Sequence, residues 1–248
     1  MSMVDQAGQA TFNERLSDFV SRVEYRRVVT PQERRAIFKL RHDCYLREGA
    51  IEARPSGLFR DRYDFDPNVW IFGVHVDGAL VGSVRIHVAS KQFKRSPGMT
   101  VFKDLLGPRL EQGQIVVDPT RFVVSAEASR DYPLLPHAVL RLCFMACDHF
   151  EADVGLATVR TEHRGFYRRF FAMESMSEPR FYPSLKKPIT MMGVDFFAQR
   201  NAVMTRYPFF ASTASERGRL FGKKVTQEKT LERSDFTQSQ GDLVLVGA

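Results

Sequence analysis

Apolar positions along this chain fall into short runs typical of strands and longer, mixed runs typical of amphipathic helices. The helices that this pattern predicts span 12–23, 31–48, 100–106, 133–153 and 162–171. The predicted strands span 25–29, 69–76, 80–88, 115–124, 155–160 and 187–197. Because a long helix connects two of these strands, the order indicates an α/β (α+β) fold with a mixed sheet flanked by helices.

Two short signals mark where elements begin and turn. Thr30 precedes Pro31 at the start of the second predicted helix, where threonine caps the first turn and proline loses no hydrogen bond. Asp77-Gly78 separates the second and third strands and is typical of a two-residue hairpin turn. The polar, aromatic segment 54–68 is expected to be a loop.

The predicted strand over 115–124 is interrupted by Asp118, Pro119 and Arg121, although its ends are apolar. A buried charge is costly unless it is paired, and a proline removes one hydrogen bond of the strand ladder. These residues therefore indicate either an edge strand with both charges in water or a functional site inside the sheet.

The chain has 248 residues, 44% of them hydrophobic, which suits one large domain or one and a half and is enough for a sizeable core. No apolar run reaches the ~20 residues of a membrane span, and the first residues do not resemble a secretory signal. The three cysteines lack zinc-type spacing, so Cys143 and Cys147 are expected to pack in the core and no metal site is expected. These features favour a protein of the reducing cytoplasm.

We expect an N-terminal helical segment over 1–29, a main domain over 30–211 and a polar C-terminal tail over 212–248. The net charge of +7 favours an acidic partner, which includes nucleic acid, an acidic carrier protein or a phosphate-bearing substrate. No nucleic-acid-binding motif is present, so nucleic acid is not the expected partner.

Four segments carry a resemblance to a known superfamily. They are Arg41 in the second helix, Asp61-Arg62-Tyr63-Asp64, Gly82-Ser83-Val84-Arg85 and Asp118-x-x-Arg121-Phe122. In this order they resemble GNAT-like acyltransferases, and more narrowly the branch that contains LuxI-type acyl-homoserine-lactone synthases and FeeM-type N-acyl amino acid synthases. The resemblance covers roughly residues 30–200. It implies a three-layer fold with a mostly antiparallel central sheet and two splayed central strands.

Departures from the LuxI type favour the FeeM type. Asp118 stands where the LuxI type usually has glutamate, and the only tryptophan, Trp70, is not at that type's early position. By contrast, the segments 44–51, 61–64 and 163–169 are similar to the FeeM type. The resemblance therefore implies transfer of a long-chain acyl group to an amino acid. A lactone synthase that uses S-adenosylmethionine and a non-catalytic binding module are the alternatives.

The resemblance also bears on the acyl donor. Ordinary GNAT enzymes bind the pyrophosphate of CoA at a glycine-rich turn after the central strand, but residues 125–133 contain no glycine. We therefore expect the donor to be an acyl-phosphopantetheine on an acyl carrier protein, with acyl-CoA as the alternative and no tightly bound cofactor. The basic residues expected to contact an acidic carrier are Arg164, Arg168, Arg169, Arg180, Lys186 and Lys187. A solvated cationic surface is the other interpretation.

The expected catalytic residues are Asp118, Arg121, Arg85 and Tyr167, and the expected substrate-binding residues are Arg41, Asp61, Asp64, Phe122, Val123, Val124 and His163. Asp118 would take a proton from the incoming ammonium or bind it, and the amides of 122–124 would face the thioester oxygen. Tyr167 would protonate the leaving thiolate. Alternatively, the ion pairs only fix the loop over 54–68, and Tyr167 belongs to the core.

Overall fold

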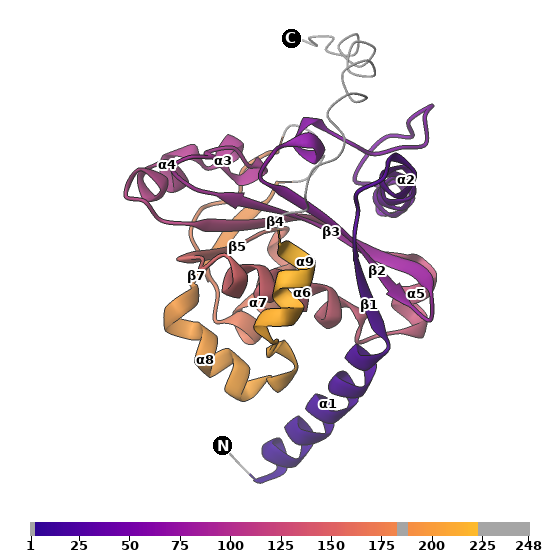
Figure 1. Ribbon diagram of the computed structural model, residues 1–248, viewed down its shortest axis with the longest axis vertical. Helices are drawn as coiled ribbons and strands as arrows, with labels where there is room; N and C mark the ends of the chain where they lie inside the picture. The colour runs from indigo at the N-terminus through magenta and orange to yellow at the C-terminus, as the bar shows by residue number, and fades with distance from the viewer. Residues whose placement is uncertain (1–2, 183–187, 223–248) are drawn as a thin grey trace.

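A seven-stranded mixed sheet forms the centre of the computed structural model, which describes residues 3–182 and 188–222 (Figure 1). Across the sheet the strands are β1 (Val23–Arg27), β2 (Val69–Val76), β3 (Ala79–Ala89), β4 (Val116–Val124), β5 (Val154–Val159), β7 (Thr190–Asp195) and β6 (Glu174–Ser175). Neighbouring strands are antiparallel except β4 and β5, which run parallel. The predicted mixed, mostly antiparallel sheet is confirmed.

Helices cover both faces of this sheet (Figure 1). On one face lie α2 (Pro31–Arg47), α3 (Pro97–Val101) and α4 (Lys103–Glu111). On the other face lie α6 (Leu135–His149), α7 (Arg164–Phe171), α8 (Phe196–Arg206) and α9 (Ala214–Phe221). The remaining helices are α1 (Met3–Ser21) and α5 (Ala126–Asp131), with short 3-10 turns η1 (Arg62–Phe65), η2 (Thr161–His163) and η3 (Pro208–Phe210). No helix of the described ranges is long and apolar enough to cross a membrane.

Both local signals are confirmed. The Thr30 side chain accepts a hydrogen bond from the Glu33 backbone, and the Glu33 side chain accepts one from the Thr30 backbone, which forms a capping box at the start of α2. At the hairpin, Asp77 and Gly78 have φ of 51° and 82°, the left-handed conformation that this turn requires.

Three differences concern the ends of elements. The helix predicted over 100–106 is two helices, α3 and α4, which meet at Phe102. The last predicted strand ends at Asp195, because the side chain of Asp195 caps α8 by accepting a hydrogen bond from Ala198. The segment predicted as a polar tail begins with α9, whose Phe221 is buried in the main core. The sequence did not predict these features, because a single capping residue or a single apolar residue in a charged helix gives a much weaker signal than a long periodic pattern.

The two central strands separate soon after they begin to pair, as the resemblance implied. Val116 lies opposite Val154 and Val117 opposite Gly155, and the described strands have no pairing beyond these positions. On its other edge β4 continues to pair with β3, across a bulge at Arg121, where φ is 53°. A bulge leaves an unpaired residue and bends the strand, which here directs β4 away from β5.

Candidate active site

The gap between β4 and β5 opens into a large cavity on the α6 side of the sheet. Its volume is ≈ 710 Å³, within the ~300–1,000 Å³ usual for small-molecule sites. Most of its wall is apolar. The helix side chains that line it include Leu140, Cys143, Phe144, Cys147, Phe166, Tyr167, Phe171, Phe196 and Val203. We call this space the apolar cavity.

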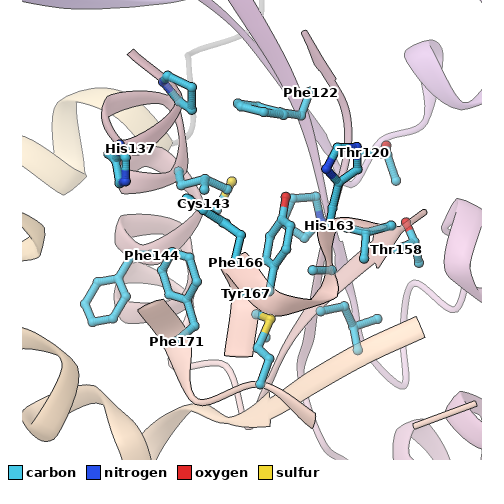
Figure 2. A pocket seen from close by; sticks show the side chains of 18 of the residues that line it. Thr120, Phe122, His137, Cys143, Phe144, Thr158, His163, Phe166, Tyr167 and Phe171 are labelled. Atoms are coloured by element: carbon cyan, nitrogen blue, oxygen red, sulfur yellow. The ribbon is translucent and has the colours of Figure 1, made fainter. Parts of the chain in front are cut away.

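Six residues predicted for the site line the apolar cavity. They are Arg121, Phe122, Val123 and Val124 on β4, and His163 and Tyr167 at the start of and within α7. Figure 2 shows Tyr167 projecting between α6, which carries Cys143, and the strands that carry Thr120 and Thr158. Burial raises the pKa of the Tyr167 hydroxyl, so this group stays protonated at neutral pH.

On the other face of the sheet, beside the split between β4 and β5, lies a cluster of buried charges. Arg41 Nη1 lies 2.7 Å from Asp64 Oδ1. Arg85 Nη1 contacts both carboxylates, at 2.6 Å from Asp61 Oδ1 and 3.0 Å from Asp64 Oδ1. Arg121 Nη2 lies 2.6 Å from Asp61 Oδ2. These five residues, which we call the ionic cluster, connect α2, β3 and β4 through η1.

The spacing of the two aspartates follows from a helix cap. Asp61 Oδ1 accepts a hydrogen bond from the Tyr63 backbone at 3.0 Å, and Asp64 Oδ2 accepts one from the Asp61 backbone at 2.9 Å. This reciprocal capping box fixes η1, and it leaves the other carboxylate oxygens for the arginines. The Asp-x-x-Asp segment is therefore both a turn and the anionic half of the ionic cluster.

Charge pairing controls ionisation in the ionic cluster. Burial would raise the pKa of Asp61, but Arg85 and Arg121 outweigh burial and hold that pKa below its ordinary value. Burial acts on Asp64 in the same way, and Arg41 and Arg85 again lower its pKa. Both carboxylates are consequently ionised at neutral pH, so their charges can compensate two of the three guanidinium charges.

Arg85 keeps unused hydrogen-bonding capacity. Its side chain is fully buried, and Nη2 has no hydrogen-bond partner among the described residues. A buried donor that makes no hydrogen bond costs ~1–3 kcal/mol. The ionic cluster carries three guanidinium groups and two carboxylates, so an anion bound next to it would balance the remaining positive charge.

A second, smaller pocket adjoins the ionic cluster and has a volume of ≈ 70 Å³. Its lining residues are Tyr45, Arg85, Pro97, Gly98, Thr120, Arg121, Thr158, Tyr182 and Ile189. Tyr45, Thr120, Arg121, Thr158 and Ile189 line the apolar cavity as well. The two spaces therefore meet at the split between β4 and β5. We call the smaller one the polar pocket.

Asp118 lies beside the polar pocket rather than in its wall. The side chain is fully buried, and Oδ2 accepts a hydrogen bond from the Gly98 backbone at 2.7 Å. The Oδ1 atom has no hydrogen-bond partner among the described residues. Gly98 itself lines the pocket, and a methyl group at this position would lie 2.8 Å from Asp118 Oδ2. Asp118 thus sets the position of one wall of the pocket.

The residues predicted to contact a carrier protein are spread over the surface. Arg168 and Arg169 are exposed on α7, whereas Arg164 is half-buried at the start of that helix. Arg180 is paired with Asp104, at 2.6 Å between Nη1 and Oδ1. Lys186 and Lys187 lie outside the described residues. Their assignment to a carrier site stays a prediction.

Sequence reasoning missed three polar residues at the junction of the two spaces, Tyr45, Thr120 and Thr158. Thr120 Oγ1 accepts a hydrogen bond from Arg85 Nε at 3.0 Å. Alternation along a strand places Thr120 on the same face as Asp118, which was a usable signal. Thr158 gave no such signal, because its place opposite Thr120 depends on the split between the strands.

Comparison with known proteins gives the family. The family model of the N-acyl amino acid synthase FeeM matches residues 36–195, more than half of the chain. The chain belongs to the FeeM family of N-acyl amino acid synthases. It is therefore an acyltransferase, as the four sequence segments predicted. The comparison with curated proteins returned no match.

Solved structures agree in fold at low sequence identity. The structure of FeeM, an N-acyl amino acid synthase from uncultured soil microbes, has a TM-score of 0.62 and 16% identity, covering 75% of this chain and 97% of that one. A CoA-dependent acyl-homoserine lactone synthase, BjaI with MTA, has a TM-score of 0.56 and 19% identity, covering 76% and 88%. A second CoA-dependent lactone synthase, MesI, has a TM-score of 0.51 and 20% identity, covering 78% and 97%. The GNAT-like fold is confirmed.

Proposed function

We propose that this enzyme transfers a long-chain fatty acyl group from a thioester to the amino group of a free amino acid. The observation that carries the proposal is the junction of two unlike spaces, a large apolar cavity and a small polar pocket, at Thr120 and Thr158. The apolar cavity suits an alkyl chain. The polar pocket, with Arg85 and Arg121 in its wall, suits the carboxylate of an amino acid.

The donor thioester would lie in the split between β4 and β5. Beyond Val117 the β4 edge that faces β5 is unpaired in the described strands, so its backbone groups are available to the amides of a pantetheine arm. This arrangement would bring the thioester carbonyl to the bulge at Arg121, with the acyl chain in the apolar cavity. Amides of 122–124 near the bulge would then stabilise the oxyanion, as the family resemblance implies.

Acyl transfer at this junction requires the ammonium nitrogen to lose two protons and the leaving thiolate to gain one. After the first proton has left, the amine nitrogen attacks the thioester carbon, the C–N bond forms, and the C–S bond breaks to release a thiolate. The second nitrogen proton replaces the one that the thiolate takes from its proton donor, so that one proton in all passes to solvent. We assign Asp118 as the acceptor of the ammonium proton through water, since Oδ1 is buried without a partner among the described residues. We assign Tyr167 as the proton donor to the thiolate, because it lines the cavity and is protonated.

A carrier protein is the proposed donor. Ser125, which follows β4, caps α5 by accepting a hydrogen bond from the Ala128 backbone, so a compact capped turn stands where a glycine-rich phosphate loop would be. A carrier-bound arm needs no pyrophosphate site. The exposed Arg168 and Arg169 on α7, near the cavity residue His163, offer positive charge to an acidic carrier.

The test uses the purified full-length protein with a palmitoyl carrier protein and, separately, palmitoyl-CoA. Each donor is offered with a mixture of the 20 amino acids or with S-adenosylmethionine, and the products are identified by mass spectrometry. We expect N-acyl amino acids, formed with a higher kcat/KM from the carrier protein. Products that require S-adenosylmethionine and contain a lactone ring would overturn the assigned acceptor, and equal use of CoA would overturn the assigned donor.

A further inference from the structure

The polar pocket is small compared with many of the amino acids that an N-acyl amino acid synthase could acylate. Its volume of ≈ 70 Å³ is about a tenth of the ≈ 710 Å³ of the apolar cavity. A water molecule occupies ~30 Å³ in the liquid, and a cavity of ~150 Å³ holds one benzene ring. The polar pocket is less than half that size, so within its own walls it has no room for an aromatic side chain together with an ammonium and a carboxylate.

The walls of the pocket are packed from several directions. Tyr182 is 8% exposed and Ile189 is 6% exposed, and both belong to a hydrophobic cluster that includes residues of α4, β4 and β5. Pro97 is buried at the start of α3, and Gly98 is held by Asp118. Enlargement of the pocket would require these buried groups to move. Interiors packed at native density resist such movement.

The positions of the carboxylate and the amine of a bound amino acid decide where the substituent on its Cα must lie. A carboxylate in the polar pocket would lie beside Arg121, which lines both spaces. The amine must approach the junction with the apolar cavity at Thr120 and Thr158, where the thioester would lie. The substituent on Cα is then left with the space bounded by Pro97 and Tyr182.

We propose that the acceptor is glycine or an α-amino acid with a side chain no larger than that of serine. This inference rests on the proposed function, because it assumes that the polar pocket receives the acceptor. Tyr182 is then a specificity-determining residue. Its ring limits the Cα substituent, while Arg121 holds the carboxylate that all amino acids share.

The experiment compares single acceptors with one saturating palmitoyl donor. Glycine, alanine and serine are tested against leucine, phenylalanine and tyrosine, and kcat/KM is measured for each. We expect the small acceptors to exceed phenylalanine and tyrosine by at least ~10-fold, since even one misplaced methylene in a tight pocket costs 10-fold or more. Comparable rates for tyrosine and glycine would overturn the inference and leave the proposed function standing. Acylation of no amino acid would overturn both.

Two variants test whether the named wall sets this preference. Tyr182→Ala should raise kcat/KM for leucine and phenylalanine relative to glycine, and Ile189→Ala should do so to a smaller extent. Tyr132→Ala is the matched control, because Tyr132 is half-buried and lines neither space. If both wall variants fold, as judged by circular dichroism, and keep the wild-type ratio of acceptors, Tyr182 and Ile189 do not determine specificity.

Discussion

Arg121 and Asp61 are joined by an ion pair of 2.6 Å between Nη2 and Oδ2, although 60 residues separate them along the chain. Arg121 lines both the apolar cavity and the polar pocket. Asp61 also binds Arg85, so a single carboxylate holds one guanidinium from β3 and one from β4. This pair therefore ties the loop that carries Asp61 to the point where the central strands separate.

Replacement of Arg121 by lysine should impair catalysis although the charge is kept. Lysine lacks the planar fork with which arginine can reach Asp61 and a substrate carboxylate together. Loss of one partner from a buried charged contact costs ~2–5 kcal/mol, so Arg121→Lys should lower kcat/KM for the amino acid by ~30-fold or more. The measurement is steady-state kinetics with varied acceptor. Arg35→Lys, at an exposed position of α2, is the matched control. Wild-type kinetics for Arg121→Lys would show that the fork is not needed.

Two variants separate the proposed roles of Asp118. Asparagine can still accept the hydrogen bond from Gly98 but cannot take a proton, whereas alanine can do neither. If Asp118 relays the ammonium proton, Asp118→Asn should lower kcat by ~10²–10⁴, the usual contribution of a general base. An asparagine variant with wild-type kcat, beside a defective alanine variant, would assign Asp118 to positioning Gly98 alone.

The parts of the site that sequence could predict are those encoded by short spacing. Asp61 and Asp64 were predicted from the Asp-x-x-Asp segment that carries the family resemblance, and in the structure this three-residue spacing both forms a capping box and supplies the anions of the ionic cluster. The bulge at Arg121 was partly foreseeable, since a charge and a proline interrupt an apolar strand.

The size of the polar pocket could not be predicted in this way. Its walls come from Pro97 at the start of α3 and from Tyr182, residues that are far apart in sequence and meet only through the packed sheet. Nothing local to either residue signals a binding site. The same holds for Thr158, whose distance from β4 depends on how far the two strands part.

Asp64 should stabilise the fold in a pH-dependent way. Arg41 and Arg85 hold the pKa of Asp64 below its ordinary value, so the folded state binds a proton less readily than the unfolded state. This stabilisation is present above the unfolded pKa of ~4 and is lost as the pH falls through the lower folded pKa. Asp64→Asn should reduce the free energy of unfolding at pH 7 by ~3–5 kcal/mol, because it leaves two buried guanidinium groups undercompensated.

Urea unfolding of the wild type and of Asp64→Asn between pH 7 and pH 3 measures this effect. The difference between them should shrink toward the acid end. Asp43→Asn is the control, since Asp43 is half-exposed and its pair with Lys39 lies on the surface. A difference that stays constant over the whole range would contradict a role for the Asp64 charge.

Charge reversal on α7 should weaken the use of a carrier-bound donor. Arg168→Glu with Arg169→Glu should raise the KM for palmitoyl carrier protein by ~10-fold or more at low salt, with a smaller effect at high salt, because exposed charges are screened. The KM for palmitoyl-pantetheine should not change. Arg15→Glu with Arg35→Glu, two exposed positions on α1 and α2, is the matched control. Equal effects on both donors would point to damage at the site rather than to a lost carrier contact.

Cys143 should set how long an acyl chain the apolar cavity accepts. Its thiol is buried on α6 and lines the cavity, and burial raises the pKa of this thiol to about 12, so it behaves as a small neutral side chain. Cys143→Phe would fill part of the cavity. Each methylene that can no longer be buried costs ~0.8 kcal/mol, or about fourfold in affinity. The variant should therefore shift the preferred donor to a shorter chain. Competition among C8 to C18 acyl donors, read by mass spectrometry, measures this shift.

Leu142→Phe is the control, because it overpacks the same helix at a buried position outside the cavity, and it should leave the chain-length profile unchanged. If both variants gave the wild-type profile, the acyl chain would not lie against Cys143.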